Sequence, residues 1–183
     1  MLRAWDFSGG AYANTDFSGL RVAVLQTSRE NLAAEKTTAD SAVIYLPQDA
    51  TKAQRGALLA WVKASQPELK SGKIYSRLVP LQISGTGAGF TLSGGKFLSL
   101  NTAGLESCDT ACGAALWYEP RTPTSVFTVA LNRSSQVTEP LLKLKWDDSA
   151  KRSVFIGKFG GSASPKTEFV TASDWCAPTE KGF

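Results

Sequence analysis

The sequence predicts an α+β domain, built mainly of antiparallel β-strands with one principal amphipathic helix at about residues 51–65. Short segments with alternating apolar residues recur along the chain, glycine-rich turns separate them, and a single segment has helical spacing. The chain has 183 residues, of which 43% are hydrophobic and 20% charged, so it is long enough to bury its own core. We expect one β-rich globular domain over residues 1–160 and a loosely attached Gly/Ser/Pro/Thr-rich tail over residues 161–183.

The first two predicted strands lie on either side of a polar segment. Apolar residues alternate from Leu20 to Val24, and again at Val43 and Tyr45, which indicates strands that bury one face. The polar segment 27–41 between them is predicted to be a loop or a partly helical excursion.

The predicted helix has the clearest start signal in the chain. Thr51-Lys52-Ala53-Gln54 fits the capping box, in which the threonine hydroxyl and the glutamine side chain satisfy backbone amides of the first turn. Pro67 ends the element. Apolar residues recur between these signals at three- and four-residue spacing, at Ala57, Leu58, Trp61 and Val62.

The pattern returns to period two after the helix. Ser93-Gly94-Gly95-Lys96 is predicted to be a hairpin turn, because glycine adopts positive φ without steric cost. Gly85–Gly89 leads into a strand and not a helix, which favours a turn there over a dinucleotide-binding loop. Asp147-Asp148-Ser149 is predicted to be the turn of the last hairpin. The remaining strands are expected within Tyr75–Ile83, Phe90–Leu92, Phe97–Leu100, Ala114–Tyr118, Val126–Leu131, Leu142–Trp146 and Val154–Phe159.

The chain contains no histidine, and this excludes several kinds of active site. Neither a Ser-His-Asp nor a Cys-His nucleophile pair can form, and no imidazole can bind a metal. Asp147 and Asp148 are adjacent carboxylates, but in a turn both would face water and would not act as a catalytic acid and base. We therefore predict no catalytic residues, no cofactor and no enzymatic activity.

Three cysteines, Cys108, Cys112 and Cys176, are the most reactive side chains that the sequence offers. Cys108 and Cys112 are close enough for a local disulfide, which is the interpretation that we prefer. The alternatives are inert thiols, or thiol ligation of Cu(I) or Zn(II). Two sulfurs do not complete a zinc site, so a metal would need Cys176, Asp109 or Glu106 as a further ligand.

The net charge of +4 is distributed unevenly. From Lys52 to Lys96 the chain has seven basic residues and one acidic residue, Glu68. This excess favours a solvated face, with an acidic partner as the alternative. No clustered basic run or stacking motif predicts a nucleic-acid partner, and the apolar runs are too short for a membrane-spanning helix. A protein partner and a small ligand both stay open.

Several segments resemble the bacterial family known as domain of unknown function 1326, in particular its secreted members. The matching segments cover most of residues 4–160 and are Ala4–Gly10, Asp16–Val24, Asp49–Leu58, Cys108–Pro120 and Ser153–Phe159. The resemblance implies a bacterial protein outside the cytoplasm. In the family, a leader and a cysteine-containing segment come before the Trp-Asp-Phe region, whereas this sequence begins close to Trp5-Asp6-Phe7. Met1–Trp5 lacks the features of a secretion signal. We expect either a cytoplasmic protein or a chain whose leader has been removed.

The function predicted from the sequence is that of a non-catalytic, extracytoplasmic bacterial accessory or binding protein. The alternative is thiol-based Cu(I) handling through Cys108, Cys112 and Cys176.

Overall fold

The computed structural model describes residues 1–29, 38–69, 72–104, 127–148, 153–157 and 165–171. These residues form mostly β-strands, largely antiparallel, with one α-helix. The predicted α+β class is therefore confirmed. The expected strand Ala114–Tyr118 and most of the expected loop 27–41 lie outside the described residues.

The first half of the main sheet has the strand order β6–β5–β4–β1. Its strands are β1 (Leu2–Phe7), β4 (Arg21–Thr27), β5 (Ser41–Pro47) and β6 (Lys73–Val79). β5 and β6 are parallel, whereas the other neighbours are antiparallel. A parallel pair needs a crossover connection, and here helix α1 (Lys52–Ser65) supplies it.

The second half is mainly a run of antiparallel strands that begins after Pro80. Its members are β7 (Leu81–Thr86), β8 (Gly89–Gly94), β9 (Leu98–Ala103) and β10 (Phe127–Glu139). On its other edge β10 pairs with two strands, β12 (Ser153–Gly157) over its first part and β11 (Leu144–Asp148) over its last part.

Two predictions about the C-terminal part of the chain were wrong. Pro165–Thr171 form β13, which pairs with β1 on one side and β12 on the other, so this stretch of the expected loose tail is held in the sheet by backbone hydrogen bonds on both edges. Asp147 and Asp148 lie in β11 and not in a hairpin turn. β11 and β12 both pair with β10, one after the other along its length, and do not form a hairpin with each other. Residues 172–183 lie outside the described residues.

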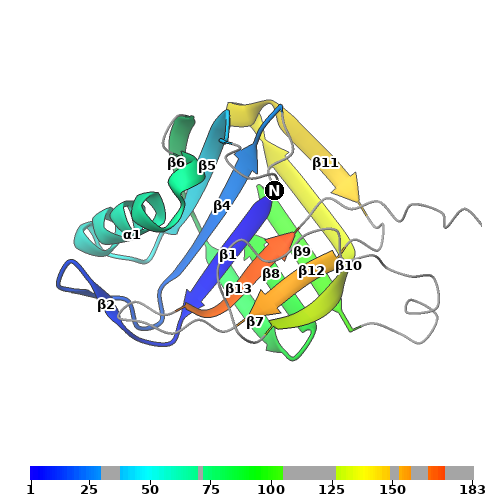
Figure 1. Cartoon of the computed structure of the whole chain (residues 1–183), viewed down its shortest axis with the longest axis horizontal. Coiled ribbons are helices and arrows are strands. Elements are labelled where there is room, and N and C mark those ends of the chain that lie inside the picture. The colour runs from blue at the N-terminus through cyan, green and yellow to red at the C-terminus, as the bar shows by residue number, and fades with distance from the viewer. Residues whose placement is uncertain (30–37, 70–71, 105–126, 149–152, 158–164, 172–183) are drawn as a thin grey trace, which may run out of the picture.

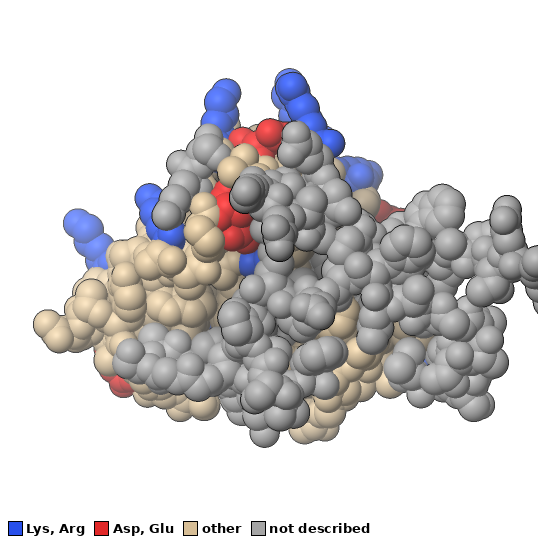
Figure 2. All heavy atoms as spheres, viewed as in Figure 1, with Lys and Arg blue, Asp and Glu red and all other residues tan. Residues whose placement is uncertain are grey.

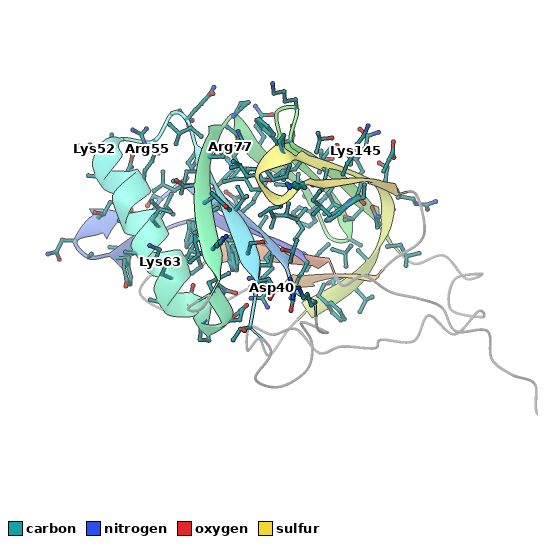
Figure 3. All side chains as sticks on the ribbon, turned by 90° about the horizontal axis from the view of Figure 1, so that it is seen from above. Asp40, Lys52, Arg55, Lys63, Arg77 and Lys145 are labelled. Atoms are coloured by element: carbon teal, nitrogen blue, oxygen red, sulfur yellow. The ribbon has the colours of Figure 1, made fainter. Side chains whose placement is uncertain are left out.

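The sheet curls on itself, as Figure 1 shows, so that β7, β8 and β9 lie behind β1 and β13. β7 contacts β4 and β5 across the interior. Side chains from both halves fill the space inside the curl (Figure 3). The inner core contains Leu2, Ala4, Ala23, Leu25, Val43, Tyr45, Val79, Leu81, Ile83, Leu92, Leu98, Leu100, Ala130, Val137, Val154 and Ile156.

A second core lies between α1 and the outer face of β1, β4 and β5. Ala57, Leu58 and Val62 are buried there, as the helical spacing predicts. Trp61 is half-buried and meets the rings of Trp5 and Phe7 edge-on, at centroid distances of 5.5 and 5.0 Å. The helix thus covers the side of the sheet that the strands do not enclose.

The local signals in the sequence are confirmed at the helix and at two turns. Both hydrogen bonds of the capping box are present, with Gln54 N donating to Thr51 Oγ1 at 3.2 Å and Thr51 N donating to Gln54 Oε1 at 2.9 Å. Gly87 and Gly95 have φ of +60° and +61° in the β7–β8 and β8–β9 turns. Gly85 lies within β7 at a φ of +135°, and a Cβ there would collide with the backbone of Gly89 and Phe90.

A small separate hairpin packs against α1. Its strands are β2 (Ala11–Tyr12) and β3 (Thr15–Asp16). The turn residues Ala13 and Asn14 have φ of +49° and +60°, the signs that a type I′ turn requires at both central positions.

Two short 3₁₀ helices complete the described elements, η1 (Pro67–Leu69) and η2 (Pro140–Leu142). None of the helices in the described part of the chain is long and apolar enough to cross a membrane.

Candidate functional site

Three ionisable side chains from distant parts of the chain meet on the inner side of the curled sheet. Tyr45 on β5 lies opposite Arg77 on β6 in the parallel register, so their side chains are directed to the same face. Glu139 ends β10, two residues after the inward-facing Val137. We call Tyr45, Arg77 and Glu139 the Glu139 cluster.

Every oxygen of the Glu139 carboxylate accepts two hydrogen bonds. Oε2 accepts from Tyr45 Oη at 2.8 Å and from Arg77 Nε at 3.0 Å. Oε1 accepts from Arg77 Nη2 at 2.7 Å and from the backbone N of Leu141 at 2.9 Å. The Glu139 side chain is 0% exposed, so these four donors replace the water that the carboxylate loses on folding.

The guanidinium of Arg77 is held on a second side as well. Its Cζ lies 4.0 Å from the ring centroid of Phe97, which follows the β8–β9 turn, and a cation above an aromatic face is attracted by the ring electrons. The cluster and its contact with Phe97 therefore link β5 and β6, at one end of the strand order, to β10 and the β8–β9 turn in the second half of the sheet. Figure 3 shows Arg77 on β6, on the side of the molecule that faces η2.

The surroundings fix the protonation state of the cluster. Burial by itself raises the pKa of Glu139, but the hydrogen bonds from Arg77, Leu141 and Tyr45 outweigh it and hold this pKa below its usual value. Burial, together with the hydrogen bond to Glu139, raises the pKa of Tyr45. The hydrogen bond to Glu139 raises the pKa of Arg77. At neutral pH the cluster is a carboxylate, a guanidinium and a neutral phenol.

A second buried ion pair lies on the helix side of the sheet. Arg3 Nη1 donates to Glu68 Oε1 at 2.8 Å, and Gln26 Nε2 approaches the same oxygen at 3.3 Å. Arg3 and Glu68 are 1% and 8% exposed. Because these residues belong to β1, η1 and β4, this pair fastens the end of the crossover connection to the outer face of the sheet.

The predicted metal ligands Cys108, Cys112 and Cys176 all lie outside the described residues. The same holds for Glu106 and Asp109. Over the ranges that the structure describes, no three His, Cys, Asp or Glu side chains gather where they could hold a metal ion.

The Glu139 cluster was not predicted from the sequence. Tyr45 stands inside the apolar run Ala42–Leu46, and a buried phenol needs a hydrogen-bond partner, so a partner could have been expected. Its identity could not, because Glu139 is 94 residues away from Tyr45 and 62 from Arg77.

No family model, no curated protein and no solved structure matches the chain. The resemblance to domain of unknown function 1326 therefore stays a prediction.

Proposed function

We propose that the chain is a non-catalytic bacterial protein that acts outside the cytoplasm as an accessory or binding module. One observation carries this proposal: Glu139, which has two ionisable partners in the described part of the chain, is fully buried and accepts four hydrogen bonds from the protein itself.

A catalytic acid or base must reach its substrate and needs a pKa near the working pH. Glu139 has no exposed surface, and its pKa is held below the usual range. Arg77, its main partner, already makes a bidentate ion pair and an aromatic contact. These features support a role of the cluster in holding the sheet together and not in transforming a substrate.

The surface supports a preference for partners that present acidic groups. Within the described ranges, eight Lys and Arg side chains are exposed, compared with four Asp side chains. Figure 2 shows Lys and Arg side chains projecting along the left side of the molecule and at its upper end, where Asp and Glu atoms lie between them. An excess of exposed positive charge attracts acidic groups and makes such binding sensitive to salt.

The proposal is tested by assaying the purified protein on a broad panel of hydrolase and oxidoreductase substrates, together with two variants. Glu139→Gln removes the buried charge, and Asp147→Asn removes an exposed carboxylate on the adjacent strand as a matched control. We expect no turnover above background in any of the three proteins. Turnover that Glu139→Gln abolishes and Asp147→Asn retains would contradict the proposal.

The location outside the cytoplasm is a separate part of the proposal and rests on the family resemblance. Fractionation of bacteria that express the full gene should recover the protein outside the cytoplasmic fraction. Recovery with cytoplasmic markers alone would contradict it.

A further inference from the structure

The inner face of β10 carries a second polar group, between Ala130 and Glu139. The pairing of β10 with β9 shifts register between Asn132 and Ser134, so Arg133 is an extra residue in the strand. Asn132 lies opposite Thr102, and Ser135 lies opposite the inward-facing Leu100. The bulge thus directs both side chains toward the interior, where they are 2% and 6% exposed.

The hydrogen bonds between these side chains are incomplete. Asn132 Nδ2 donates to Ser135 Oγ at 3.1 Å, and Trp146 Nε1 donates to the same oxygen at 3.3 Å. Asn132 Oδ1 is buried and has no hydrogen-bond partner in the described part of the chain. With two donors directed at its oxygen, the Ser135 hydroxyl still has its own hydrogen to donate.

Reversing the carboxamide of Asn132 does not remove the deficit. Ser135 could then donate to Oδ1, but both N–H groups of the amide would point to the place where Oδ1 now lies. In either orientation one end of a buried amide lacks a partner, which is unfavourable because that group has lost its hydrogen bonds to water. An oxygen that both accepts and donates satisfies either arrangement.

We propose that Asn132 and Ser135 bind the oxygen of a neutral hydroxyl group inside the curled sheet. The hydroxyl belongs either to a water molecule or to a small molecule held in the interior. We expect a neutral group because Trp146, the other side chain that contacts the pair, carries no charge. Burying an ion without a charged partner would cost far more free energy than burying a neutral hydroxyl. Proteins commonly hold water in this way at buried polar groups.

The outer face of the same strands provides a matched control. Asn101 Nδ2 donates to Ser134 Oγ at 3.0 Å, and Thr91 Oγ1 lies 3.1 Å from Asn101 Oδ1 as its donor. This carboxamide has partners at both ends, so it needs no additional oxygen.

The test is a crystal structure of the full chain at a resolution that shows ordered water, for the wild type and for Asn132→Leu and Asn101→Leu. We expect a density peak about 3 Å from both the Asn132 amide and Ser135 Oγ in the wild type and in Asn101→Leu. The peak should be lost in Asn132→Leu. A wild-type map with no density beside Asn132, or with a protein atom bonded to the open amide end, would overturn the proposal even if the variant does not fold.

Native mass spectrometry of the same preparations distinguishes the two sources of the hydroxyl. A mass equal to that of the chain, together with the density peak, identifies water. An added mass that denaturation and Asn132→Leu both remove identifies a bound small molecule. An added mass that Asn132→Leu retains, with no peak beside Asn132, would overturn the proposal. The site does not depend on the protein being non-catalytic, so this experiment can fail while the proposed function stands.

Discussion

Glu139 shows how one side chain can connect parts of a sheet that do not pair with each other. Its four hydrogen bonds reach Tyr45 on β5, Arg77 on β6 and the first turn of η2. A buried ion pair is not necessarily more stable than apolar residues in its place, but removal of one partner is costly because the other charge stays behind.

Glu139→Gln should therefore destabilise the protein by about 3 kcal/mol, the low end for a broken buried pair, because the Arg77 side chain is 23% exposed and water can hydrate part of its charge. Urea unfolding of wild type and variant measures the difference. The double variant Arg77→Met/Glu139→Leu should recover part of the loss, since no unpaired charge remains. Equal stability of Glu139→Gln and wild type would contradict the role that we assign to the cluster.

Acid should weaken the fold through the same residue. The pKa of Glu139 is lower in the folded than in the unfolded protein, so its contribution to stability is fully present above the unfolded value of about 4.3 and is lost as the pH falls through the folded value. Tyr45 and Arg77, which face it, keep their protons throughout this range. Below about pH 4.3, the melting temperature should fall more steeply with decreasing pH for wild type than for Glu139→Gln. Parallel curves would show that Glu139 does not titrate as proposed.

The cysteines allow a prediction that does not need their coordinates. In an oxidising compartment, a Cys108–Cys112 disulfide leaves Cys176 as the one reactive thiol of the three cysteines. Thiol titration of the denatured, unreduced protein should give one thiol per chain, and Cys108→Ser should give two. Three thiols in the wild type would contradict the disulfide. Cu(I) titration under anaerobic conditions, against a Cys108→Ser/Cys112→Ser variant, would then test the copper alternative.

At the level of elements, the sequence predicts what local chemistry determines. The limits of α1 follow from the Thr51 cap and the spacing of its apolar residues, and the β7–β8 and β8–β9 turns follow from their glycines. β1 and β13 were not predicted as strands because each is held by pairing with distant segments. β1 pairs with β4 and β13, and β13 pairs with β1 and β12. The Glu139 cluster was missed for the same reason, since it depends on how distant strands come together.

The β2–β3 hairpin contains a residue that is poorly suited to its backbone. Ala13 has φ of +49°, a conformation that costs an L-residue roughly 1 to 2 kcal/mol, and Asn-Gly is the preferred pair for this turn. Ala13→Asn together with Asn14→Gly should therefore stabilise the protein by about 1 kcal/mol in urea unfolding.

Ala11 offers a control for this change, because it is an exposed alanine of the same hairpin without positive φ. Ala11→Asn should give no gain. If the turn variant is no more stable than the wild type, the hairpin does not contribute to the cooperative unfolding of the domain.

For the molecule as a whole, the decisive feature is the strand order β6–β5–β4–β1–β13–β12–β10–β9–β8–β7. β13 joins the two halves of the sheet, and within each half neighbouring strands pair without a break. Composition could not predict this, because Pro165–Thr171 resembles a polar tail until β1 and β12 supply partners on both edges.

A chain that ends after residue 164 should therefore lose the cooperative thermal transition, because β1 and β12 would each be left with an unpaired edge in the middle of the sheet. A chain that ends after residue 171 keeps β13 and should retain the transition. Circular dichroism melts of the two chains make the comparison. A normal melt for the shorter chain would show that β13 is dispensable.

The position of β13 also has a consequence for biosynthesis. Of the described strands, a ribosome makes β1 first and β13 last. Until then no nascent chain can close the sheet, and exposed strand edges invite aggregation. The order of translation thus leaves the sheet open, and accessible to chaperones, until β13 has been made.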